Sequence, residues 1–145
     1  MKPKTSKRVE SLLRSADLRR TKPRAAIMSV LLQARKPLTQ DQISSNLADT
    51  APNKVTIYRT LERFCEAGLL HKAFMQKRAW HFELADRCTE KQCHPHFTCK
   101  KCGVTQCLTK LSLPLVKGLN NGFIIHRQQV RLEGLCPRCA GKKGR

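Results

Sequence analysis

Two pairs of cysteines with the same spacing constrain this chain more than any other feature of its sequence. Two residues separate Cys99 from Cys102 and Cys136 from Cys139, and 33 residues lie between the pairs. Together the pairs supply the four thiolates of a closed, tetrahedral zinc site, which leaves no coordination position for a substrate. Two disulfides are the alternative, and zinc is favoured because nothing in the sequence directs the chain to an oxidising compartment.

The composition indicates a polyanionic partner. The 145 residues include 29 Lys and Arg against 10 Asp and Glu, a formal net charge of +19. Such an excess favours nucleic acid as the partner, ahead of an acidic membrane surface. No apolar run approaches the roughly 20 residues of a membrane span, and the basic N-terminal segment has no signal-peptide core. We therefore expect a cytoplasmic protein without a membrane partner.

The first half of the sequence has the pattern of a helical DNA-binding domain. Apolar periodicity and capping residues predict four helices, which begin near residue 6, at Thr21, at Thr39 and at Asn53. The fourth helix is expected over residues 53–67, with Gly68 ending it. Its outer face combines hydroxyl, aromatic and guanidinium groups that suit a groove of DNA, on Lys54, Thr56, Tyr58, Arg59 and Arg63.

After Gly68 the apolar period changes from helical to two. Leu70, Lys72 and Phe74 alternate, and Trp80, Phe82 and Leu84 do so after a basic turn over residues 76–78. This pattern predicts a β-hairpin. Helices followed by a hairpin indicate a winged helix-turn-helix, with residues 53–67 as the recognition helix in the major groove.

Several motifs resemble the ferric uptake regulator (Fur) superfamily in their order along residues 10–140. They are LRRTKPR at 18–24, VTIYRTL at 55–61, AGLL at 67–70, HPHFTCKKCG at 94–103 and GLCPRC at 134–139. The resemblance implies an α+β protein with a winged-helix DNA-binding domain over 1–84, a hinge over 85–92 and a small α/β dimerisation domain over 93–145. It further implies a metal-dependent repressor that binds DNA as a homodimer, and the two-fold symmetry predicts a palindromic operator.

The resemblance also assigns roles to individual DNA-facing residues. Tyr58 would touch base methyl groups, Arg59 would hold a phosphate, and Arg19 would enter the minor groove. The family usually has Lys at the last of these positions, and Arg suits a narrow, A/T-rich groove at least as well. Lys54 and Thr56 complete the predicted DNA-binding set.

A second, regulatory metal site is expected beside the four cysteines. His94 and His96 stand at alternate positions before a predicted strand, so both side chains face one side. The resemblance to the zinc-sensing (Zur) branch adds His71, after the recognition helix, and Cys88, six residues before His94. The expected ligands are therefore His71, Cys88, His94 and His96, with Glu83 and Cys93 as less certain candidates.

The expected ligands favour zinc as the sensed metal. One thiolate among imidazoles suits Zn²⁺ better than Fe²⁺ or Mn²⁺, which prefer carboxylate-rich sites. Iron and peroxide sensors of the family tend to use a His in the loop before the short helix, and residues 33–38 contain none. The sequence thus predicts a zinc-responsive repressor of zinc-uptake genes, with one structural and one regulatory zinc ion per chain.

Three alternatives stay open at this point. One is an iron-, manganese- or peroxide-responsive regulator, and another is a DNA-binding protein that holds zinc constitutively and senses nothing. The third is a zinc nucleobase deaminase, which His81-x-Glu83 and the late cysteine pair suggest. That match is poor because Pro137 follows the first cysteine instead of preceding it. We expect no enzymatic activity.

The later part of the second half predicts a helix and a strand. Apolar residues between Leu111 and Leu119 indicate a short helix with Pro114 in its first turn, and Phe123–Leu132 reads as a strand. The family's second dimerisation-domain metal site looks degraded, because its late His is replaced by Gln128. His126 offers a shifted ligand, and Cys107 is expected to be a spare thiol.

Overall fold

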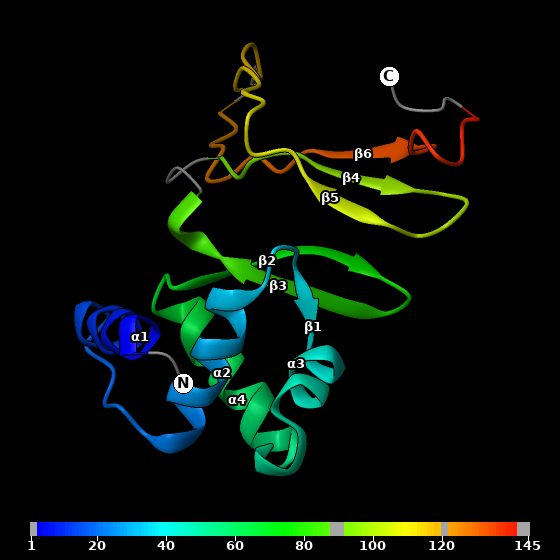
Figure 1. Cartoon of the computed structure of the whole chain (residues 1–145). Coiled ribbons are helices and arrows are strands. Elements are labelled where there is room, and N and C mark those ends of the chain that lie inside the picture. The colour runs from blue at the N-terminus through cyan, green and yellow to red at the C-terminus, as the bar shows by residue number, and fades with distance from the viewer. Residues whose placement is uncertain (1–2, 88–91, 120–121, 142–145) are drawn as a thin grey trace. The chain divides into compact units, whose positions relative to one another are not determined.

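A computed structural model describes residues 3–87, 92–119 and 122–141, and the chain divides into two compact units, Met1–Asp86 and Arg87–Arg145. Figure 1 shows helices in the first unit and strands in both. In the described part of the chain, every helix is too short or too polar to cross a membrane.

Four α-helices build most of the first unit: α1 (Pro3–Ser15), α2 (Lys22–Gln33), α3 (Gln40–Leu47) and α4 (Lys54–Glu66). Short 3₁₀ turns cover Ala48–Thr50 and Ala85–Arg87. The three predicted N-caps are confirmed. Thr21 accepts a hydrogen bond from the N–H of Arg24, Thr39 and Gln42 form both halves of a capping box, and Asn53 accepts from the N–H of Thr56 at 2.8 Å.

The helices enclose a single apolar core. Each of them buries one stripe, so side chains from all four helices join one cluster with side chains of the sheet of this unit. The side chains that are wholly excluded from solvent are Val9, Ile27, Met28, Ile43, Ile57, Leu61 and Phe64. This core holds α4 with its apolar stripe inward and its polar face outward.

A three-stranded antiparallel sheet completes the first unit. Its strands are β1 (Leu38–Thr39), β2 (Leu70–Gln76) and β3 (Ala79–Leu84), in the order β1-β3-β2. The predicted hairpin is therefore confirmed, and β1 is a strand that the sequence analysis missed. The simple alternation expected along β2 is wrong at two places. Leu70 and His71 are both buried, and so are Ala73 and Phe74, where the register shifts between Lys72 and Phe74.

The second unit is built on a small mixed sheet. Its strands are β4 (His96–Cys99), β5 (Thr105–Cys107) and β6 (Arg131–Gly134), in the order β5-β4-β6. Strand β4 pairs antiparallel with β5 and parallel with β6. The α+β class is confirmed, but the described residues of this unit contain no α-helix, so the unit is β-rich instead of α/β.

Two predictions for the second unit are wrong. Residues 111–119 form no helix, and of the strand expected over Phe123–Leu132 only the last two residues belong to β6. Instead, the side chain of Gln128 holds the irregular segment: it accepts from the N–H of Val116 at 2.7 Å and donates to the carbonyl of Pro114 at 3.0 Å.

The physical reason is that no apolar surface in the described part of the second unit covers these segments. Short helices in water depend on the burial of an apolar face more than on propensity. Here the side chains that should form such a face are exposed, namely Leu111, Val116, Leu119, Phe123 and Ile124.

Candidate metal centre and nucleic-acid interface

The four cysteines of the two pairs, each pair forming one zinc knuckle, converge in the second unit. The Sγ atoms of Cys99, Cys102, Cys136 and Cys139 all lie within 4.8 Å of one another, and all four residues are free thiols. The sheet brings them together, because the parallel register of β4 and β6 sets Cys99 opposite Gly134, just before the second knuckle. The N–H of Lys100 donates to the carbonyl of Gly134 at 2.8 Å and fixes that register.

Backbone groups around the four thiols favour the charged form of at least one of them. The N–H of Cys136 donates to Sγ of Cys99 at 3.4 Å. Backbone N–H donors, first that of Cys102 and then that of Cys136, lower the pKa of Cys99 to about 6. By contrast, the hydrogen bond with the Cys136 thiol and the desolvation of the sulfur raise the pKa of Cys139 to about 12.

These opposite pKa shifts mean that the first thiol of the cluster loses its proton easily and that the last thiol keeps its proton. A dication among the sulfurs removes that resistance, since it balances the thiolates that ligate it. The donor type, the number of donors and the two-residue spacing therefore fit a tetrahedral, structural zinc ion. The two-disulfide alternative is not what the structure shows.

Two further candidate ligands face each other across the hairpin of the first unit. His71 on β2 and Glu83 on β3 are direct cross-strand partners, and Nε2 of His71 lies 3.4 Å from Oε2 of Glu83. Their side chains are only 3% and 11% exposed. A buried carboxylate at this distance orients the imidazole ring, and it is also a metal ligand in its own right.

The second unit contributes a separate group of soft donors. Ligand atoms of His94, His96 and Cys107 lie within 4.8 Å of one another. Sγ of Cys93 lies 3.9 Å from Nδ1 of His94, and the rings of His94 and His96 are 4.6 Å apart between centroids. The two histidines thus lie close together with Cys93 beside them, and their role as metal ligands stays a prediction. Cys88 lies outside the described residues.

Cys107 is the candidate ligand that the sequence analysis set aside as a spare thiol. Strand β5 pairs with β4 so that Cys107 stands opposite His96. The tight turn after Cys99, closed by the N–H of Gly103 on the carbonyl of Cys99 at 2.9 Å, sets this register. Counting pairs outward from that turn could have found Cys107 in the sequence. The other spare candidate, His126, is exposed, and Gln128 binds backbone groups.

The outer face of α4 is the candidate DNA contact. Its apolar stripe, including Ile57 and Leu61, is buried, whereas Lys54, Tyr58 and Arg59 are exposed. Thr56 is half-buried on the first turn. Arg19 is exposed in the connection before α2, where the Arg24 guanidinium donates to its carbonyl at 2.8 Å. All five predicted DNA-binding residues thus belong to the first unit.

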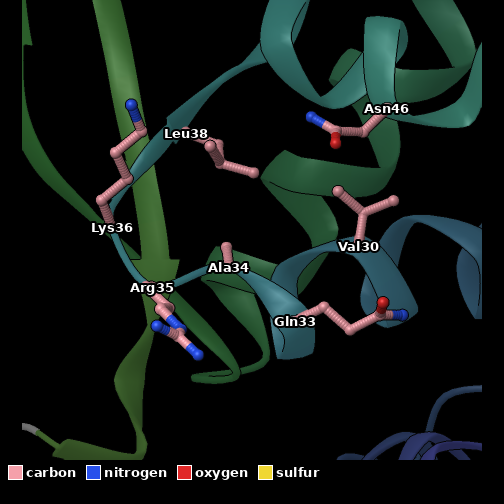
Figure 2. Close-up of a pocket in the computed structure, with 7 residues that line it drawn as sticks. All are labelled: Val30, Gln33, Ala34, Arg35, Lys36, Leu38 and Asn46. Atoms are coloured by element: carbon pink, nitrogen blue, oxygen red, sulfur yellow. The ribbon is translucent and has the colours of Figure 1, made fainter.

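A cavity of about 460 Å³ in the first unit contains no strong metal ligand. Figure 2 shows Val30 of α2 and Asn46 of α3 facing Leu38 of β1 across it. The remaining lining residues are Gln33, Ala34, Arg35 and Lys36. The loop before α3 therefore lines the cavity with the cations Arg35 and Lys36, and no imidazole or carboxylate is among the lining residues.

Comparison with known proteins now gives the family. The model of the ferric uptake regulator family matches residues 15–119. The chain belongs to this family. Its members are metal-dependent, DNA-binding transcriptional regulators that dimerise and are not enzymes, and this chain is accordingly a regulator of that kind.

The curated relatives of this Fur-family chain carry several functional names. The transcriptional regulator FurA of Mycobacterium tuberculosis is 29% identical over 133 residues, which cover 88% of this chain and 87% of the relative. The ferric uptake regulation protein of Bordetella parapertussis is 27% identical over 94% of this chain and 98% of its own length. The peroxide-responsive repressor PerR of Staphylococcus epidermidis is 27% identical over 88% of this chain and 85% of its own.

Solved structures support the fold. The ferric uptake regulator of Pseudomonas aeruginosa with manganese gives a TM-score of 0.62 at 23% identity, covering 88% of this chain and 96% of that one. A zinc uptake regulator in complex with zinc and DNA gives 0.62 at 19% identity, covering 97% of both chains. At these identities the likeness extends to the Fur fold and not to the metal that is sensed.

Proposed function

We propose that this Fur-family regulator is a zinc-responsive repressor of zinc-uptake genes that acts in the cytoplasm. In this proposal residues 1–84 read DNA, residues 85–92 are a hinge, and residues 93–145 form the dimer. Two copies bind a palindromic, A/T-rich operator through α4 and the preceding connection. The DNA contacts come from Arg19, Lys54, Thr56, Tyr58 and Arg59, which are basic or polar and belong to one unit.

The observation that carries the choice of zinc is the donor set of the second unit. Two thiols, Cys93 and Cys107, lie beside the imidazoles of His94 and His96. Thiolate and imidazole donors suit Zn²⁺, whereas Fe²⁺ and Mn²⁺ favour sites rich in carboxylates. The loop of residues 33–38 also lacks a histidine.

The proposed regulatory ion takes donors from both units. His94 and His96 come from the second unit, His71 comes from the first, and Cys88 comes from the hinge. Glu83, Cys93 and Cys107 are further candidates. Glu83 holds the ring of His71 in the buried pair described above, so it acts either as a ligand or as the group that orients one. An ion shared in this way would favour one relative orientation of the units, the one in which both copies of α4 fit successive major grooves.

In this mechanism the two metals have different roles. The Cys₄ zinc is permanent, because its binding free energy is part of the folding free energy of the second unit. The regulatory ion is reversible, and metal and DNA raise each other's affinity by the same factor. Such coupling is typically about 5- to 150-fold.

The test is operator binding measured against buffered free Zn²⁺, Fe²⁺ and Mn²⁺, with Fe²⁺ handled without oxygen. We expect zinc to produce binding at the lowest free concentration. His94→Ala and Cys88→Ser should abolish the zinc response while leaving a folded dimer, whereas Cys65→Ser, a thiol on α4, should leave it unchanged. Full zinc-dependent binding by Cys88→Ser would remove Cys88 from the site.

An iron- or peroxide-responsive regulator is the second candidate, and one observation favours it. The buried Glu83 gives the first unit a carboxylate next to His71, and a carboxylate is a donor that Fe²⁺ prefers. Operator binding at lower free Fe²⁺ than free Zn²⁺ would decide for this candidate. Binding that survives a mild chelator, with one zinc retained per chain, would instead indicate a constitutive DNA-binding protein.

A further inference from the structure

We propose that the cavity between α2, β1 and α3 binds a small hydroxycarboxylate, a molecule with a carboxylate at one end, an apolar body and a hydroxyl group at the other end. The cavity has a volume of about 460 Å³, and small-molecule sites usually measure about 300–1,000 Å³. The proposal goes beyond the proposed function, because none of the predicted DNA-binding or metal-binding residues lines this cavity.

One end of the cavity carries two adjacent cations. Figure 2 shows Arg35 and Lys36 on the side opposite Asn46. Both cations are exposed, and within the described part of the chain neither forms an ion pair. By comparison, Nζ of Lys54 in the same unit lies 3.1 Å from Oδ1 of Asp41. Two neighbouring positive charges without a carboxylate to balance them attract an anion, and a guanidinium binds a carboxylate through two parallel hydrogen bonds.

The loop that carries these cations is held at both ends. At its start, the N–H of Ala34 donates to two carbonyls of the last turn of α2, at 3.1 and 3.3 Å. At its end, Leu38 is buried and pairs with Phe82 on β3. Between them, Pro37 disfavours a helical backbone at Lys36, the residue before it. The loop is therefore short and anchored, which lowers the cost of ordering it when a ligand binds.

The middle of the cavity is apolar. Val30 on α2, Ala34 at the end of this helix and Leu38 on β1 lie between the two polar ends (Figure 2). Val30 and Ala34 are half-buried, so solvent reaches part of their surface. Covering this surface removes apolar area from water, and it therefore favours a ligand with an apolar body over a bare inorganic anion.

The other end of the cavity presents amide oxygens. Nδ2 of Asn46 donates to the carbonyl of Gln42 at 2.7 Å, and Nε2 of Gln33 donates to the carbonyl and to Oγ of Ser29, both at 3.2 Å. These bonds turn the donor side of each amide toward its own helix. Within the described part of the chain, Oδ1 of Asn46 accepts no hydrogen bond. This oxygen selects a donor on the ligand, and a hydroxyl group donates without adding positive charge to a basic protein.

The test is a titration of the full-length protein with 4-hydroxybenzoate, followed by heteronuclear NMR. The carboxylate, ring and hydroxyl group of this probe match the three parts of the cavity. We expect saturable shifts of the backbone amide signals, confined to the end of α2, the following loop and α3. Benzoate lacks the hydroxyl group and should bind about fivefold more weakly, and 4-hydroxybenzamide lacks the charge and should bind about tenfold more weakly.

Four variants assign the binding to this cavity. Arg35→Gln/Lys36→Gln should weaken the binding of 4-hydroxybenzoate about tenfold and remove its advantage over 4-hydroxybenzamide. Asn46→Ala should remove the advantage of 4-hydroxybenzoate over benzoate. Val30→Phe fills the cavity with a ring and should abolish binding while the helical circular dichroism is retained. The control is Arg19→Gln/Arg20→Gln, which removes two adjacent exposed cations of the same unit outside the cavity and should change the affinity by less than twofold.

Three outcomes would overturn the proposal. Shifts that do not saturate would show that no defined site exists, and unchanged affinity in Arg35→Gln/Lys36→Gln would place the site elsewhere. Equal affinity for inorganic phosphate and 4-hydroxybenzoate would indicate a simple anion site and exclude the hydroxycarboxylate class. Because the titration uses neither DNA nor added metal, its failure leaves the proposed function unaffected. Conversely, a protein that binds operator with none of the metals overturns the proposed function and leaves this cavity site unaffected.

Discussion

The two units of this chain bury different kinds of side chain. The first unit excludes Leu, Ile, Met and Phe from solvent in one continuous core that all four helices share. In the described part of the second unit, the buried residues are the candidate ligands Cys93, His94, His96 and Cys99, together with Pro95 and Thr98. Meanwhile most of the large apolar side chains in the described part of the second unit are exposed, with Phe123 and Ile124 at 70% and 78%.

This contrast shows that the units obtain their stability from different sources. A core of the first kind stabilises a domain through burial of apolar area, at about 25 cal/mol per Å². A small unit without such a core needs a metal or a partner chain. We therefore expect the first unit to fold by itself and the second to depend on its zinc ion and on a second copy.

The largest test of this contrast is removal of a knuckle cysteine. Cys99→Ser should lose the structural zinc, whose binding contributes about 10–16 kcal/mol in small zinc domains. We expect a monomer whose second unit is unfolded while the helical circular dichroism of the first unit persists. Metal content per chain and analytical ultracentrifugation measure both effects, with Cys65→Ser as the control. A metal-free, native-like dimer would contradict the contrast.

A core substitution in α4 tests the first unit in the opposite way. Phe64 is wholly buried, and Phe64→Ala should cost about 3–5 kcal/mol through lost burial and the cavity left behind. Denaturant unfolding followed by helical circular dichroism gives the change. If each chain retains one zinc ion after this substitution, the two units are independent. If the zinc ion is lost together with the helical structure of the first unit, they are not.

The exposed apolar residues of the second unit provide a third test. In an isolated chain Ile124→Asp should be nearly neutral, because the side chain is already in solvent. In a dimer that covers it, the buried charge should weaken association by about 2–4 kcal/mol. Sedimentation equilibrium measures the dimer constant, and Lys117→Asp, which changes charge in the same irregular segment, is the control. Unchanged dimerisation would place the interface elsewhere.

The smallest effect concerns a helix cap in the first unit. Asn53→Ala removes the acceptor for the N–H of Thr56 and should cost about 1 kcal/mol of stability. Thermal unfolding should detect it, and Asn53→Asp should restore most of the loss. Because Asn53 is expected to stabilise α4 and not to contact DNA, operator affinity should fall only in proportion to the fraction of unfolded protein. A much larger fall would indicate that Asn53 itself touches DNA.

Sequence patterns succeeded where the interacting groups are close along the chain. Thr21, the Thr39–Gln42 capping box and Asn53 were all predicted, since a capping side chain and the N–H from which it accepts are three residues apart. The two-residue strand β1 was missed because its pairing with β3 involves residues more than 40 positions away. The helix expected between Leu111 and Leu119 failed because apolar periodicity describes a face that needs a surface to cover it.

The sequence alone determined that the four knuckle cysteines belong to one site, because neither pair completes a tetrahedron without the other. It also determined the capped helices and the positive net charge, which indicates a polyanionic partner. Only the tertiary structure decided that His71 faces Glu83 and that Lys77 and Arg78 occupy a strained turn. Strand register and backbone dihedral angles decide those neighbours, and neither is encoded in residue spacing.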